Sequence, residues 1–301
     1  MQNVRSPLTN SEQVTLIETI SSAELIRDWN EKGVDISEEL KGHAEIRMYE
    51  CEQTGLRFFW PLDVAGSSKL YEALQQFPWY YLPKKWEYDV ALKTIAACRK
   101  AFEVGCGDGA FIAKAIAAGI DIVGIELNPK AVEAAQKRGL PVDLIDLASA
   151  ADRYAGSADA VCAFQVLEHV TEIRAFIENS LRIVKPGGLL IFCVPNAEGF
   201  LRELPSPLDK PPHHMSRWSV KTFASLSQIF PVDLVSTAFE PLSSPQVGAY
   251  VASKWSMMRR RFPHFRWLFT RLTRRAVSVI FRLGLRRFAS GQALYAVLKK
   301  R

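Results

Sequence analysis

The chain has few cysteines, and their spacing excludes the common cysteine-based structures. Its 301 residues include five cysteines, and no two of them form the C-x-x-C pair of a zinc ribbon. Scattered free thiols favour a reducing compartment, so we expect a cytoplasmic protein. Residues 1–6 lack the apolar core of a signal peptide, and no apolar run is long enough to cross a bilayer. Any membrane association would therefore be peripheral, at the inner membrane face.

Acidic residues are absent from the last part of the chain. The last of them is Glu240, whereas residues 250–301 contain fourteen Lys and Arg side chains. The whole chain has a net charge of +6, so residues 1–249 carry a net charge of −8. Such an asymmetry indicates a negatively charged partner, either a membrane surface or nucleic acid. Nucleic acid is the weaker alternative, because the basic stretch contains no recognisable recognition motif.

Three glycines at alternate positions form the most informative stretch of the chain. An apolar pair at 101–102 leads into Glu103 and then into Gly105, Gly107 and Gly109. An alanine-rich segment follows, so the pattern predicts a strand, a tight turn and a helix. A ligand in such a turn lies against the helix N-terminus of an open parallel sheet. The spacing G-x-G-x-G differs from the G-x-G-x-x-G of dinucleotide-binding turns, which disfavours NAD(P).

Carboxylates occur near the ends of the next two predicted strands. Residues 121–126 predict a second strand, whose Glu126 can accept two hydrogen bonds from the vicinal hydroxyls of a ribose. NAD enzymes bind the ribose through a carboxylate in the same position. Glu126 therefore predicts a nucleoside ligand but does not distinguish NAD(P) from other nucleoside cofactors. Residues 142–147 predict a third strand that includes Asp146. A role for Asp146 as a loop acid or helix cap is an equal alternative to ligand binding.

The following residues continue this alternation of strands and helices. Residues 158–164 predict a fourth strand, which the sequence QVLEHV at 165–170 follows. The sequence KPGG at 185–188 predicts a turn, and 189–195 predict a nearly continuous buried strand.

In this order, these features resemble the class I S-adenosylmethionine (SAM) dependent methyltransferases. The resemblance rests on the glycine stretch with its acid, on QVLEHV and on VKPGG before the buried strand, and it covers about residues 85–240. It implies an α/β fold with a Rossmann-like doubly wound sheet, mostly parallel with an antiparallel last strand. It also implies SAM as the cofactor, with Asp146 beside the adenine. The implied cofactor-binding residues are Glu103, Gly105, Cys106, Gly107, Asp108, Gly109, Glu126, Leu127, Asp146, Leu147 and Gln165.

Three histidines are candidates for chemistry on the methyl acceptor. An oxygen nucleophile gains from a general base with a pKa near neutral, and histidine is the usual one. His169 follows the fourth strand, while His213 and His214 belong to a segment similar to the H-x-x-x-[WF]-[ST] that lies over the substrate in small-molecule methyltransferases. We therefore predict His169 and His213 as catalytic residues, and His214 and Trp218 as substrate contacts. Structural or surface histidines are the alternative interpretation.

The resemblance also bears on metal binding. In quinone-pathway O-methyltransferases, acids and a histidine after strand four can hold a divalent metal. Gln165 stands at the first of those positions here, which weakens that role for Glu168 and His169. Cys51 stands alone where some relatives carry a cysteine-pair knuckle. We therefore predict no metal.

The chain divides into four predicted parts. Residues 1–84 form an N-terminal extension with a small hairpin and an aromatic cover, and residues 85–242 form the methyltransferase core. Residues 243–291 form a basic helical insertion. Residues 292–301 form a terminal strand that completes the core sheet beside a strand at 231–237.

The basic insertion has two distinct helical stripes. One stripe from Phe265 to Leu283 is apolar, and a neighbouring stripe is rich in arginine. This is the composition of an interfacial helix on an anionic membrane. A helix packed on its own domain, with a solvated basic face, is the alternative.

These features predict a SAM-dependent methyltransferase, most simply one that O-methylates a small or lipid-linked acceptor. An NAD(P)-dependent oxidoreductase is one alternative, which the glycine spacing and Glu103 disfavour. A membrane-associated adaptor without activity is the other. The intact cofactor positions, Glu103 and Glu126 among them, argue against it.

Overall fold

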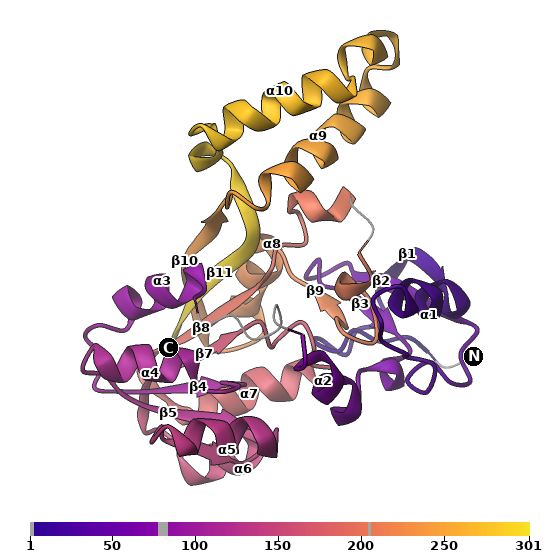
Figure 1. The fold of residues 1–301 in the computed structure, drawn as a ribbon. Helices are drawn as coiled ribbons and strands as arrows, with labels where there is room; N and C mark the ends of the chain where they lie inside the picture. The colour runs from indigo at the N-terminus through magenta and orange to yellow at the C-terminus, as the bar shows by residue number, and fades with distance from the viewer. Residues whose placement is uncertain (1–2, 78–83, 204–205) are drawn as a thin grey trace.

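The computed structural model describes residues 3–77, 84–203 and 206–301, which contain a seven-stranded and a four-stranded sheet (Figure 1). The strands of the larger sheet are β4 (Lys100–Val104), β5 (Asp121–Glu126), β6 (Val142–Leu144), β7 (Ala158–Phe164), β8 (Val184–Pro195), β10 (Val232–Pro241) and β11 (Ser290–Lys300). Their order is β10-β11-β8-β7-β4-β5-β6. The strands from β8 to β6 pair in parallel, and β11 is antiparallel to both β8 and β10. This confirms the predicted sheet.

Helices cover both faces of this sheet, because successive residues of each central strand point to opposite sides. In β4, Phe102 packs into one buried cluster and Ala101 into the other. The helices of the first cluster are α6 (Leu147–Arg153), α7 (Ile173–Ile183) and α8 (Val220–Ser225). Those of the second are α3 (Trp86–Thr94), α4 (Ala110–Ala117) and α5 (Pro129–Lys137). A sheet wound in this way leaves the carboxyl ends of its parallel strands open to a ligand.

The smaller sheet joins the N-terminal residues to the core. Its order is β1-β2-β3-β9, in which β2 (Glu45–Cys51) and β3 (Arg57–Trp60) are the predicted hairpin. β1 (Val14–Ser21) and the following α1 (Ser22–Asn30) were not predicted. β9 (Ser216–Arg217) comes from the core, one residue after His213 and His214, and pairs with β3. This pairing fixes the histidine-bearing loop against the N-terminal sheet.

Residues 62–77 continue from this sheet toward the core. They include the short 3-10 helix Leu62–Val64 and α2 (Ser68–Leu74), which Ser67 caps by accepting a hydrogen bond from the Leu70 N–H. The predicted aromatic cover includes Trp79, Tyr80 and Tyr81, which lie outside the described residues.

The predicted turn at 185–188 lies inside β8 rather than before it. The pairing with β7 jumps from Ala158–Val184 to Ala160–Leu189, so the intervening residues bulge out of the ladder. The sequence KPGG therefore interrupts the hydrogen bonding without ending the strand.

The basic insertion forms a helical hairpin that projects from the rest of the molecule (Figure 1). Its helices are α9 (Val247–Arg261) and α10 (Arg271–Arg282), with 3-10 turns at Pro263–Leu268 and Leu285–Phe288. Among the described residues, no helix is long and apolar enough to cross a membrane.

The predicted apolar stripe from Phe265 to Leu283 is not one continuous helix. Thr270 caps α10, because its hydroxyl accepts a hydrogen bond from the Thr273 N–H while the Thr273 hydroxyl accepts one from the Thr270 N–H. This reciprocal capping starts a new helix in the middle of the predicted one.

Glycine at 124 is required by the packing behind the glycine-rich turn. A Cβ at this position would lie 2.5 Å from Cys106 Sγ and 2.9 Å from a methyl of Val142. We therefore expect Gly124→Ala to lower the free energy of unfolding by about 1–3 kcal/mol, as overpacking does. Urea denaturation measures it. As a control, Gly248→Ala in α9 meets no atom within 4 Å and should raise stability by up to about 1 kcal/mol.

Candidate active site

A cleft of about 910 Å³ opens at the carboxyl ends of the parallel strands. The loops after β4, β5 and β7 line one side of it, and α2 together with the loop that contains His213 lines another. Residues at the root of the helical hairpin reach the same cleft, among them Glu240, Gln246 and Gln292. The cleft therefore adjoins the core, the N-terminal part and the insertion.

The glycine-rich turn forms the floor beside β4. Gly105, Gly107 and Gly109 have φ angles of 70°, 55° and 79°, in the left-handed region that favours glycine. A Cβ on Gly105 would lie 2.5 Å from a methyl of Val166, so the loop after β7 packs directly on this turn. Gly105 and Gly107 line the cleft, whereas Gly109 lies at the N-terminus of α4.

The carboxylate of Glu126 is held in place by three backbone amides. Oε2 accepts a hydrogen bond from the Gly107 N–H at 2.9 Å, and Oε1 accepts from Leu127 at 2.8 Å and Asn128 at 2.9 Å. These contacts join the ends of β4 and β5 and leave acceptor capacity on Oε2 for a ligand hydroxyl. Beside it, the exposed Leu127 side chain offers an apolar surface at the cleft.

Glu103 is a buried acid with an unused oxygen. Its Oε2 has no hydrogen-bond partner among the described residues, and burial raises the pKa of its carboxyl well above the usual range. Lys85 opposes that rise in the pKa of Glu103. A cationic group of a ligand in the cleft would satisfy this oxygen.

Gln165 lines the cleft and has an unusual backbone conformation. Its φ of 56° is unusual for a residue other than glycine. Its amide donates a hydrogen bond to Glu87 Oε1 at 3.4 Å and contacts Cys193 Sγ at 3.7 Å. Backbone strain of this kind is tolerated mainly at functional sites.

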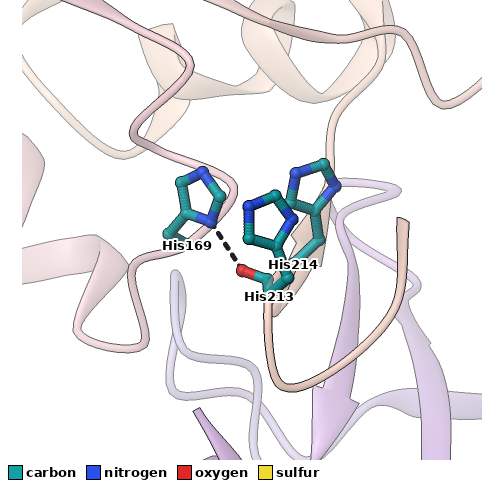
Figure 2. A group of neighbouring side chains, drawn as sticks. All are labelled: His169, His213 and His214. Atoms are coloured by element: carbon teal, nitrogen blue, oxygen red, sulfur yellow. Dashed lines mark hydrogen bonds between the residues drawn. The ribbon is translucent and has the colours of Figure 1, made fainter. Parts of the chain in front are cut away.

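The three predicted histidines lie together at the cleft (Figure 2). The ring centroids of His169 and His213 are 4.6 Å apart, those of His169 and His214 are 4.9 Å apart, and those of His213 and His214 are 4.5 Å apart. His169 Nδ1 lies 2.5 Å from the backbone oxygen of His213. We call these three residues the histidine cluster.

The histidine cluster is largely enclosed by protein. Burial, reinforced by the neighbouring imidazoles, lowers the pKa of His169 and His214 well below the usual range, and burial also lowers the pKa of His213. Neutral imidazoles can accept a proton, which protonated ones cannot. The adjoining carboxyl of Glu168 is buried, and burial raises its pKa to about 8.

Comparison with known proteins identifies the central part of the chain. Residues 102–192 match the family model described as a methyltransferase domain. The chain contains a SAM-dependent methyltransferase domain. This supports an enzyme of that class over an NAD(P)-dependent oxidoreductase or an inactive adaptor.

Several curated relatives of this methyltransferase domain share one name. The ubiquinone biosynthesis O-methyltransferase of Dechloromonas aromatica is 28% identical over 170 residues, which are 49% of this chain and 71% of that protein. The enzymes of the same name from Methylococcus capsulatus and Erwinia tasmaniensis are 32% and 29% identical, over 42% and 33% of this chain. The chain spans 63% and 43% of the length of these two relatives.

Solved structures are also similar. A SAM dependent methyltransferase from Archaeoglobus fulgidus has a TM-score of 0.48 and 15% identity, and the match covers 78% of this chain and 95% of that chain.

The residues of the methyltransferase domain fit SAM. The unused oxygen of Glu103 suits an ammonium group, and the amide-held carboxylate of Glu126 suits ribose hydroxyls. Cys106, Asp108 and Gln165 line the same cleft.

Asp146 and Leu147 are placed differently from the other predicted cofactor residues. β6 ends at Leu144, and Asp146 caps α6 by accepting hydrogen bonds from the N–H of Ser149 at 2.9 Å and its hydroxyl at 2.7 Å. Leu147 is the first residue of that helix. Neither residue lines the cleft, so the structure has Asp146 in the capping role that was its alternative interpretation.

Trp218 is not at the cleft, which corrects its prediction as a substrate contact. Its side chain is fully buried, packs on Phe223 with ring centroids 5.0 Å apart, and donates its indole N–H to the Ser216 hydroxyl. The apolar ring is therefore part of the core beneath α8. His214 of the same segment does line the cleft.

Glu87 and Asp209 were missed from the sequence, and Tyr71 was predicted as part of the aromatic cover. Tyr71 and Glu87 line the cleft, and Asp209 holds both His214 and Arg217 at 3.2 Å. Each lies in an aromatic-rich or proline-rich stretch without a motif. Only the fold brings Tyr71 and Glu87 to the cleft and Asp209 beside His214.

Proposed function

We propose that this protein transfers the methyl group of SAM to a hydroxyl oxygen of a small or lipid-linked acceptor. The observation that carries the proposal is that one cleft is lined both by the cofactor residues Glu103 and Glu126 and by the histidine cluster. The name of the curated relatives, ubiquinone biosynthesis O-methyltransferase, supports an oxygen acceptor.

SAM supplies an activated methyl group, so the residues of the cleft mainly align the acceptor with it. In the reaction that we propose, the acceptor oxygen bonds to the methyl carbon as the carbon–sulfur bond breaks, with the electron pair remaining on sulfur. The hydroxyl proton passes to a neutral imidazole, His169 or His213. Burial lowers the pKa of both imidazoles, which favours the neutral form that can accept a proton.

The assignment of the cofactor pocket is tested at Glu126. We expect two variants, Glu126→Gln, which keeps the side-chain shape, and Glu126→Ala, to weaken SAM binding. The expected loss is about 1.5–3 kcal/mol, roughly 10- to 150-fold, because each variant removes hydrogen bonds between the ribose and a charged group. Isothermal calorimetry with SAM measures this, and NAD should give no heat.

The matched control is Glu133→Gln on the outside of α5, where the carboxylate pairs with Lys137 at 2.6 Å. It should bind SAM like the unaltered protein. Unchanged SAM affinity in both Glu126 variants would contradict the assignment.

We also propose that the helical hairpin docks on an anionic membrane. α10 has no buried residue, and it exposes Leu272 at 75% and Leu283 at 82% beside its arginines. Trp267 and Phe288, in the flanking turns, are 70% and 81% exposed. Apolar side chains at the surface next to a dense positive charge match the headgroup boundary of such a membrane.

The position of the hairpin links the two proposals. Gln246, which precedes α9, and Gln292 of β11 both line the cleft. A membrane bound by the hairpin would thus lie near the root of the site, where a lipid-linked acceptor could enter. This favours a lipid-linked acceptor over a freely diffusing one.

A further inference from the structure

We propose that the histidine cluster binds one divalent transition-metal ion, of the zinc or cobalt type. Its members come from two segments, the loop after β7 and the loop before β9. One ring nitrogen from each of His169, His213 and His214 lies within 4.8 Å of one from each of the other two. Three imidazoles that converge in this way form a metal-binding set.

The contacts of the three Nδ1 atoms support this inference. His169 Nδ1 faces the His213 carbonyl at 2.5 Å, His213 Nδ1 faces the Leu208 carbonyl at 2.9 Å, and His214 Nδ1 faces a carboxylate oxygen of Asp209 at 3.2 Å. An oxygen acceptor at Nδ1 holds the proton there and leaves the lone pair on Nε2. Metal-binding histidines are oriented by this type of contact.

Glu168 places a buried carboxyl group beside the cluster, where it can balance the charge of an ion once that ion is bound. Its carboxylate is buried, both of its oxygens lack hydrogen-bond partners among the described residues, and Oε1 lies 4.0 Å from His169 Nε2. A buried carboxyl group without hydrogen-bond partners is costly in either protonation state. A cation at the cluster would offset that cost.

The ligand chemistry selects the class of metal. Neutral imidazoles suit zinc, copper, nickel and iron, whereas magnesium and calcium prefer oxygen ligands. The site therefore differs from a divalent site built on acids after strand four, because two of its three nitrogens come from His213 and His214 and Gln165 offers no carboxylate. The three ring nitrogens lie within 4.8 Å of one another, whereas nitrogens around tetrahedral zinc are about 3.4 Å apart. Small rotations of the histidine side chains would therefore have to bring the nitrogens closer together when an ion binds.

A bound ion would act on the acceptor through charge. A hydroxyl that coordinated it would release its proton to solvent in the open cleft more readily, so the imidazoles would serve as ligands instead of as bases. This use rests on the proposed function, but metal binding itself does not.

Cobalt(II) titration tests the inference on the full-length protein after treatment with a chelator. We expect one Co²⁺ per chain with the visible absorption of a four-coordinate site, and zinc should displace it. His213→Ala and His214→Ala should each weaken binding by about 100-fold or more, beyond the loss typical of an outer contact. SAM affinity and thermal unfolding report whether the variants are folded.

Two histidines outside the cluster provide matched controls. His43→Ala, which removes the ring beside Asp63, and His264→Ala in the exposed hairpin should leave the cobalt spectrum unchanged. Absence of a four-coordinate spectrum, equal cobalt affinity in the cluster variants, or thiolate-to-cobalt absorption from the cysteines would each overturn the inference. Normal SAM binding in that case would leave the proposed function standing, whereas loss of SAM binding in the unaltered protein would refute the function alone.

Discussion

His169→Ala is expected to slow methyl transfer by about 10²- to 10⁴-fold, the usual contribution of a positioned acid–base group. His169 belongs to the loop after β7 and faces the other two histidines, and its ring also meets Tyr71 edge-on with centroids 5.7 Å apart. The change removes the imidazole from the reacting oxygen but leaves Glu103 and Glu126 in place. We therefore expect the rate to fall while the affinity for SAM stays within a few-fold. Single-turnover methylation of catechol and phenol acceptors measures the rate.

His213→Ala should behave in the same way, and His43→Ala should have no effect on the rate. Addition of a chelator to the unaltered enzyme separates the two modes of activation. Loss of activity that zinc restores is expected if the cluster works through an ion. Activity that persists after chelation assigns the proton to an imidazole alone. Rates within a few-fold of normal in both histidine variants would remove the cluster from the mechanism altogether.

The cofactor side of the site could be predicted because its signals are local. Gly105, Gly107 and Glu126 follow short predicted strands, and the geometry of each turn depends on residues close in sequence. Parallel strands then bring these turns to the same edge of the sheet. The amide contacts of Glu126 express that geometry, since they join the ends of β4 and β5.

The contacts within the histidine cluster could not be predicted in this way. His169 and His213 meet because β9 pairs with β3 and because the Met215 and Ser216 amides donate to the Glu168 carbonyl. β9 has two residues, too few for a period-2 signal, and its partner lies more than 150 residues earlier in the chain.

Trp218 shows the limit of a motif. It was placed by its position after the histidines, but its large apolar ring is fully buried in the core. For Asp146, a ligand contact and a helix cap were equal alternatives, and the structure shows the two hydrogen bonds of the cap. Its contact with the adenine stays a prediction.

Replacement of Arg271, Arg274 and Arg275 by glutamate is expected to abolish binding to anionic vesicles. Each basic residue near such a surface contributes about 1 kcal/mol, so the loss of three, before any repulsion, weakens partitioning by more than about 100-fold. Co-sedimentation with vesicles of phosphatidylglycerol and phosphatidylcholine measures it. Binding by the unaltered protein should require the anionic lipid and weaken with salt.

Two further variants separate the contribution of charge to membrane binding from the contribution of apolar contact. Leu272→Ser with Leu283→Ser keeps every charge of α10 and should weaken binding less, with the salt dependence retained, because only the insertion of side chains into the headgroup boundary is lost. As a control, three exposed lysines of the N-terminal part are replaced by glutamate, which changes the net charge by the same amount at another surface. These lysines are Lys32, Lys41 and Lys69. That control should bind nearly as well as the unaltered protein, because screening limits the reach of each charge to about 10 Å. If the unaltered protein stays in the supernatant at low salt, or if the control loses as much binding as the arginine variant, α10 does not dock on a membrane and its apolar surface belongs to another partner.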